Sequence, residues 1–176
     1  QRAGAEAADA LAVEGHALSI DVRAGALEQA ERSEGTDLGL RVLVGRRQAC
    51  VSASDTSAQT IETLAERAVA MAREAPEDPY VGLADPADLA RQTDTDHLEL
   101  ADPAAEPAPA ALQEAALAAE AAALGVRGVS QVQSASASYS SRAMHMAATN
   151  GFSAGYRRTD TGLYCTAIAG EGAKMQ

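Results

Sequence analysis

The first third of the chain alternates hydrophobic and polar side chains with a period of two residues. This period is typical of half-buried β-strands. It is clearest at Leu18, Ile20 and Val22 and again over residues 38–44. Leu11 and Val13 keep the opposite phase, which predicts a bulge or tight turn at Gly15. Turns are also expected at residues 24–25, 33–35 and 45–47, where glycine lies beside small or polar residues.

Two segments change to the helical period of three to four residues. In the first, Thr56 is a candidate N-cap and hydrophobic residues recur from Ile61 to Met71, which predicts a helix ending at Glu74. The second runs from Pro109 to about residue 124, and Gly125 suits a left-handed stop. Its apolar stripe is almost all alanine, so it can approach a flat surface closely.

The remainder of the chain again has strand patterns, which predict a β-meander. Strands are expected over residues 131–140, 142–149, 152–158 and 163–169. Asn150-Gly151 is a strong hairpin signal, and residues 160–162 predict a further turn. The fold class expected is therefore α+β. An antiparallel sheet with one covering helix is followed by a helix and an antiparallel β-meander.

Charge and proline divide the 176 residues into three parts. All six prolines lie between Pro76 and Pro109, and residues 74–126 carry 12 acidic side chains against one basic side chain. We therefore expect an N-terminal α/β domain at residues 1–75, its first helix missing, and an acidic, proline-rich connection at 76–107. The truncated start of a middle domain follows at 108–176.

The formal net charge of −11 disfavours nucleic acid as a partner, because phosphate binding needs clustered cations. No apolar run is long enough to span a membrane. The sequence favours a cytoplasmic protein.

Catalytic patterns are few. Residues 151–155 match the nucleophile-elbow pattern G-x-S-x-G, but that elbow needs a helix after the serine, whereas Phe152, Ala154 and Tyr156 continue at strand period. We interpret the segment as a hairpin. His16, His97 and His145 are far apart in sequence and the two cysteines lie in strand patterns, so no catalytic and no metal residue is expected in this chain.

A basic feature stands beside the hairpin. Arg157 and Arg158 follow Asn150-Gly151 in an otherwise acidic chain and could bind a carboxylate or a carbonyl-rich peptide. A solvated strand end is the alternative. We take Asn150, Gly151, Arg157 and Arg158 as candidate contacts for a substrate or partner.

Several blocks, in order, resemble the TldD/PmbA family, the so-called modulators of DNA gyrase. They are residues 17–25, 34–42, 52–57, 76–80 with 82–85, 149–159 and 167–169. Gly-Tyr-Arg-Arg-Thr at 155–159 and Ser-Asp-Thr-Ser at 54–57 are most similar to the PmbA branch, also called TldE. The resemblance covers an N-terminal and middle-domain portion of that family.

The resemblance implies a role in a dimeric zinc metallopeptidase that trims flexible peptides. It implies that zinc is carried by a TldD-type subunit and that this chain has no cofactor of its own. The expected function is the non-zinc subunit portion, a scaffold and wall of the substrate path, paired with a TldD-type partner or with itself. Whether the chain itself counts as an enzyme stays open. The alternative is a non-enzymatic protein-binding module that acts on a protein such as gyrase or an antitoxin.

Overall fold

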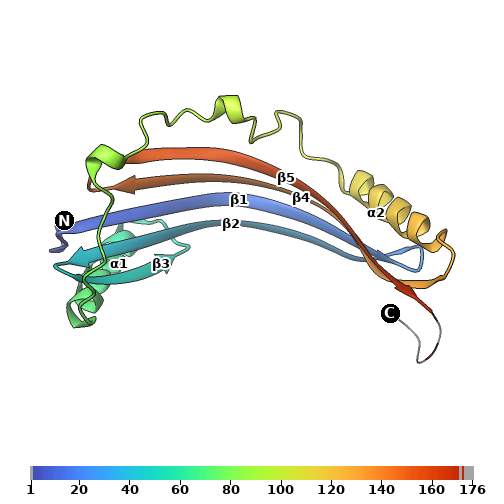
Figure 1. Cartoon of the computed structure of the whole chain (residues 1–176), viewed down its shortest axis with the longest axis horizontal. Helices are drawn as coiled ribbons and strands as arrows, with labels where there is room; N and C mark the ends of the chain where they lie inside the picture. Colours follow the sequence, from blue (N-terminus) through green and yellow to red (C-terminus); the bar gives the residue numbers. More distant parts are fainter. Residues whose placement is uncertain (1, 171, 173–176) are drawn as a thin grey trace. The chain divides into compact units, whose positions relative to one another are not determined.

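The computed structural model describes residues 2–170 and 172 and consists of five strands and two α-helices (Figure 1). In chain order these are β1 (Ala7–Arg23), β2 (Ala26–Val44), β3 (Arg47–Ala53), α1 (Ala58–Glu74), α2 (Pro109–Leu124), β4 (Val129–Ala148) and β5 (Ser153–Ala169). The connection between α1 and α2 contains two 3-10 turns, Pro86–Asp88 and Asp96–Leu98, and otherwise has an irregular backbone.

The strands form one antiparallel sheet in the order β3-β2-β1-β4-β5. In the β2–β3 pair, the register runs from Leu38 opposite Ala53 to Val44 opposite Arg47. At the other junction, the Thr149 N–H donates to the Ala8 carbonyl, where the end of β4 meets the start of β1. The α+β class predicted from the alternation of side chains is confirmed.

Contacts between residues divide the chain into two compact units. Unit 1 comprises Gln1–Gly15, Gly35–Leu100 and Arg142–Arg157, and unit 2 comprises His16–Glu34, Ala101–Ser141 and Arg158–Gln176. Both units therefore contain parts of β1, β2, β4 and β5; unit 1 also contains β3 and α1, and unit 2 contains α2. The sequence division at residues 75 and 107 stays a prediction about domains.

The core of unit 1 lies between α1 and the sheet. Val42 on β2 and Ala49 on β3 pack with Ala68, Val69 and Ala72 of α1. The N-cap of α1 is Ser57, one residue after the predicted Thr56, and its hydroxyl oxygen accepts the Thr60 N–H at 3.3 Å. Small side chains at this interface let the helix approach the sheet closely.

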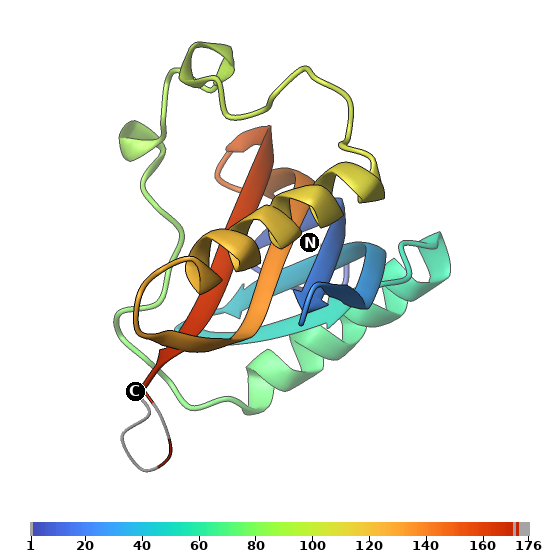
Figure 2. The same cartoon turned by 90° about the vertical axis from the view of Figure 1, so that its right-hand side faces the viewer.

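The core of unit 2 lies between α2 and the sheet, and Figure 2 shows α2 crossing obliquely over the face of β4 and β5. Leu18, Ile20 and Val22 on β1 pack with Leu112 and Ala116 on α2. Tyr139, Ala137 and Ala135 of β4 complete the cluster. The predicted stripe is confirmed at Leu112 and Ala116, which are buried in this core, and at Ala123, which is partly buried and packs against it. Gly125 ends the helix in a right-handed conformation (φ −71°), so the left-handed stop predicted there is wrong.

Several predicted turns are absent because the strands are longer than local signals indicate. Strand β1 passes through Gly15 without a tight turn, and β2 passes through residues 33–35. Strand β4 is continuous from 129 to 148, and β5 crosses residues 160–162. The expected meander is thus one long hairpin. Ladder hydrogen bonds to neighbouring strands keep serine, glycine and acidic residues extended, although their intrinsic preference is for turns.

The turns that remain are those with left-handed residues. Ala24 and Gly25 between β1 and β2 have φ of 51° and 74°, and Gly151 between β4 and β5 has φ of 96°. Among the described residues, no helix has the length and apolar character needed to cross a membrane.

Candidate functional site: an apolar groove beside the β4–β5 hairpin

The sequence-predicted contacts Asn150 and Gly151 form the tip of the β4–β5 hairpin in unit 1. The Asn150 side chain accepts the Phe152 N–H at 3.2 Å, which stabilises the turn. Its amide nitrogen Nδ2 donates to the Ala84 carbonyl oxygen at 3.0 Å. Asn150 therefore joins the hairpin to the connection that follows α1, a contact between residues 66 positions apart.

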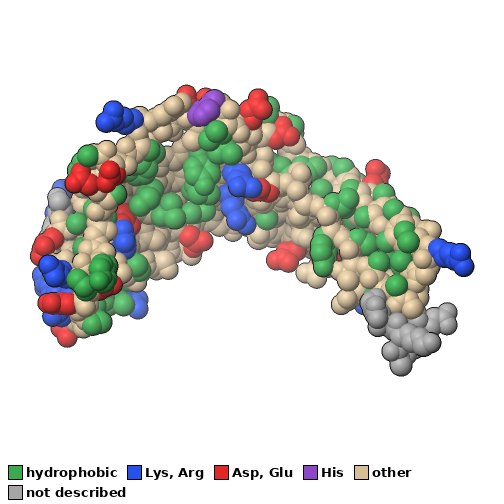
Figure 3. All heavy atoms as spheres, in the orientation of Figure 1, with side chains coloured by type: hydrophobic (Ala, Val, Ile, Leu, Met, Phe, Trp, Pro, Cys, Tyr) green, Lys and Arg blue, Asp and Glu red, His purple; other side chains and the backbone are tan. Residues whose placement is uncertain are grey.

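An apolar groove lies between this hairpin and residues 90–95 of the connection. Its volume is about 300 Å³. The sheet side is lined by Leu11, Met144, Met146, Phe152, Ala154 and Tyr156. Figure 3 shows hydrophobic side chains gathered on this face below the connection. We call this feature the apolar groove.

Strand geometry explains why these side chains share one surface. Side chains two residues apart on a strand point to the same face of a sheet, and β1, β4 and β5 are neighbours. Met144 and Met146 obey this spacing on β4, as do Phe152, Ala154 and Tyr156 at and after the start of β5. The two-residue period of the last three was visible in the sequence. Leu11 and the methionines could not be assigned to the same surface before the strand order was known.

The two candidate arginines are not at the hairpin tip. Arg157 is exposed on β5, seven residues after Asn150, which corresponds to roughly 20 Å along a strand. Arg158 belongs to unit 2, where its Nε lies 2.8 Å from Asp160 Oδ1. Nothing in the structure tests whether any of the four predicted residues contacts a substrate or partner.

The G-x-S-x-G segment is part of the hairpin, as predicted. Ser153 begins strand β5 instead of a helix, and its Oγ lies 3.0 Å from His145 Nε2. A side chain at Gly155 would collide with the Met144 carbonyl and the His145 ring. The second glycine of the pattern is therefore required by close cross-strand packing.

A second polar cluster, in unit 2, lies where the connection reaches the sheet. Arg32 on β2 donates to both carboxylate oxygens of Glu106, and the Glu106 Oε2 lies 3.0 Å from His16 Nε2. The hydrogen bond from Arg32 lowers the pKa of the Glu106 carboxyl group. The same contact raises the pKa of Arg32. Nearby, the Asp102 N–H donates to Thr159 Oγ1 at 2.8 Å. Residues 102–106 are thereby held by two polar contacts.

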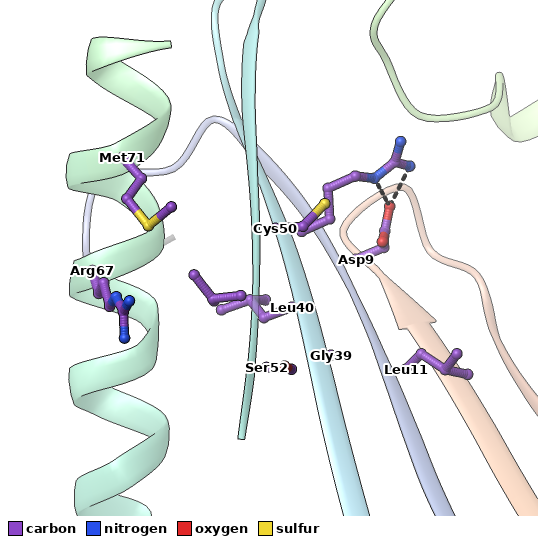
Figure 4. A pocket seen from close by; sticks show the side chains of 10 residues that line it. Asp9, Leu11, Gly39, Leu40, Cys50, Ser52, Arg67 and Met71 are labelled. Atoms are coloured by element: carbon purple, nitrogen blue, oxygen red, sulfur yellow. Dashed lines mark hydrogen bonds and ion pairs between the residues drawn. The ribbon is translucent and has the colours of Figure 1, made fainter. Parts of the chain in front are cut away.

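A larger hollow of about 590 Å³ in unit 1 is lined in part by Leu40, Cys50, Ser52, Arg67 and Met71 (Figure 4). Figure 4 shows Asp9 bonded to a neighbouring arginine; this is Arg41, whose Nε donates to Asp9 Oδ2 at 2.9 Å. Asp9 and Arg41 thus neutralise each other's charge on this part of the sheet. The Cys50 thiol is exposed and free.

The described residues of this chain do not form a zinc site. Structural or catalytic zinc takes three or four His, Cys, Asp or Glu ligands, and within residues 2–170 and 172 no such group of three is close enough together. We derive no chemical step through a metal in this chain.

Comparison with known proteins places the chain in a family. A model described as PmbA/TldA metallopeptidase domain 1 matches residues 8–72, and a model described as the central domain matches residues 81–176. The chain belongs to the PmbA/TldD family. The sequence resemblance described above is thereby confirmed. A search of curated proteins gave no match.

Solved structures share the fold. A proposed modulator of DNA gyrase from Bacteroides thetaiotaomicron matches 99% of this chain and 40% of its own, with 23% identity and a TM-score of 0.87. TldE from Thermococcus kodakarensis matches 97% of this chain and 38% of its own, with 14% identity and a TM-score of 0.74. A proposed modulator of a DNA gyrase from Thermotoga maritima matches 96% and 37%, with 15% identity and a TM-score of 0.66. The chain thus spans about two fifths of the length of these structures.

Sequence reasoning missed three features of these sites. The buried carboxylate of Glu120, on the stripe of α2, accepts the Gly25 N–H at 2.8 Å and was hidden in an alanine-rich helix. The Arg32–Glu106 pair joins residues 74 positions apart, for which a single sequence has no signal. The groove side chains of β4 were visible only as a Met-His-Met triplet.

Proposed function

We propose that this chain is the N-terminal and central portion of a non-zinc, PmbA-type subunit of a metallopeptidase that processes flexible peptides. The observation that carries the proposal is the pair of consecutive family models, for domain 1 and for the central domain, over nearly the whole chain. The likeness to a protein named TldE supports the PmbA branch. The proposal includes a cytoplasmic location, zinc held by a TldD-type partner, and a dimer with that partner or with a second copy.

In this proposal the chain supplies walls, not bond-breaking groups. In unit 1 the strands pack against α1, and in unit 2 they pack against α2, so each unit has a sheet surface backed by a helix. Such a surface can limit access to the reaction site to chains that are extended and unfolded, and it excludes bulk water from the path. The apolar groove and the hairpin tip at Asn150 are the parts of this wall best suited to touch a peptide.

A second function is favoured by two of the similar structures, which are titled proposed modulators of DNA gyrase. In that case the same surfaces bind a protein such as gyrase or an antitoxin, and no peptide is cleaved. This alternative predicts saturable binding that does not depend on a zinc-bearing partner.

Reconstitution separates the two functions. The full-length protein that carries this chain is assayed for cleavage of an unfolded peptide and of a folded protein, alone and with a TldD-type partner. We expect cleavage of the unfolded peptide only when both proteins are present. Cleavage by this protein alone would contradict the division of labour. Tight binding of gyrase or an antitoxin without any cleavage in the pair would favour the alternative.

A further inference from the structure

An arginine, Arg142, stands on β4 just before the groove residue Met144; it is not itself part of the lining of the apolar groove. Arg142 lies on β4 two residues before Met144, so the two side chains leave the same face of the sheet, with Cα atoms about 7 Å apart. Arg142 is exposed, and among residues 2–170 and 172 no carboxylate or carbonyl bonds to it. An apolar surface is thus followed directly by a cation available for pairing.

The opposite wall of the groove does not compete for that cation. Residues 90–95 contribute Ala90, Gln92, Thr93 and Thr95, all uncharged, to the lining. Asp94 lies within this segment and Asp88 and Asp96 lie just outside it, and none of the three is part of the lining. Because no lining residue is acidic, a carboxylate at the Met144 end of the groove meets no negative charge from the lining and lies close to the position of Arg142 on β4.

The lining is also adaptable. Methionine has an unbranched, polarizable side chain that fits partners of different shape, and Tyr156 adds an amphipathic rim. A volume near 300 Å³ is at the lower end of ligand pockets, which suits one or two side chains of a longer molecule.

We propose that the apolar groove binds the end of an extended peptide, with a hydrophobic side chain between Met144, Met146 and Tyr156 and the adjacent α-carboxylate on Arg142. The inference rests on the proposed function, since it defines the class of peptide that the wall receives. Peptides that end in an aliphatic or aromatic residue with a free carboxylate are preferred.

Fluorescence anisotropy with three labelled peptides tests this directly. They are Gly-Ser-Gly-Ser-Gly-Leu with a free carboxylate, its C-terminal amide, and a version ending in serine. We expect the free acid to bind about three- to tenfold more tightly than the amide, and the leucine peptide more tightly than the serine peptide. Equal binding of the acid and the amide would overturn the proposal.

Two variants and a matched control locate the site. R142Q should weaken the free acid to the level of the amide and leave the amide unchanged, whereas M146Q should weaken both. R67Q, which removes a positive charge from an exposed position on α1, should leave the binding of both the free acid and the amide unchanged. If R142Q and R67Q behave alike, the carboxylate is bound elsewhere and the inference is wrong. Its failure is distinguishable from failure of the proposed function, because cleavage in the reconstituted pair is measured independently of this binding.

Discussion

At the scale of single residues, polar contacts hold the irregular connection on the sheet. Glu106 accepts hydrogen bonds from Arg32 and lies against His16, and Asn150 reaches the Ala84 carbonyl. These contacts involve residues far apart in sequence, so each restricts a long loop. The stabilisation by Glu106 depends on the charge of its carboxylate, whereas the stabilisation by Asn150 comes from a neutral side-chain amide.

The Glu106 contact makes stability depend on pH at the acid end. The pKa of Glu106 is lowered in the folded chain by the hydrogen bond from Arg32, so its stabilising effect is present above the ordinary carboxyl pKa and is lost as pH falls through the lowered value. E106Q should therefore be less stable than the wild type at pH 7, and the difference should disappear in strong acid. Urea denaturation at a series of pH values measures this. E114Q, which alters an exposed carboxylate of α2, is the control; an equal effect of both variants would contradict the assignment.

Gly155 is the residue where packing leaves no room for a side chain. In G155A the added methyl group meets the backbone oxygen of Met144 and the ring of His145. We expect a loss of roughly 1–3 kcal/mol in the free energy of unfolding. G35A on β2, where no atom lies within 4 Å of the added carbon, should change stability little. Similar losses of free energy of unfolding in G155A and G35A would show that any glycine in a strand is sensitive to substitution, and that the contact of Gly155 with Met144 and His145 is not the cause.

At the scale of elements, the hairpin tip and the connection act together. N150A removes both the turn hydrogen bond to Phe152 and the bond to the Ala84 carbonyl. Limited proteolysis should then cut residues 84–100 faster than in the wild type, because local opening needs less free energy. N150D keeps the acceptor for Phe152 but loses the donor to Ala84, so it should resemble N150A in this assay. Protection equal to the wild type in N150D would mean that the Ala84 contact does not hold the connection.

The elements also show which parts of the fold a sequence can predict. Both helices and the Asn150-Gly151 turn were predictable because their signals are local: a periodic stripe, a cap, and a residue pair suited to positive φ. The turn expected at Ser33-Glu34-Gly35 was wrong, since pairing along β1 and β2 keeps these residues extended. Strand order, and with it the apolar groove, depends on contacts between β1, β4 and β5 that no local pattern specifies.

At the scale of the whole molecule, the chain has the role proposed above, a wall in a larger enzyme. The two family models match residues 8–72 and 81–176, and the similar structures are more than twice as long as the chain. Within the described part of the chain, side chains form ion pairs, caps and an apolar groove, and none of these groups is arranged to hold zinc. Under the function proposed above, a TldD-type partner supplies the bond-breaking chemistry.

Metal analysis of the full-length protein tests this assignment most directly. Zinc is measured by mass spectrometry on the protein purified alone and on its complex with a TldD-type partner, after dialysis against a weak chelator. We expect no stoichiometric zinc in the protein alone and stoichiometric zinc in the complex. Stoichiometric zinc in the protein alone, together with peptidase activity, would contradict it.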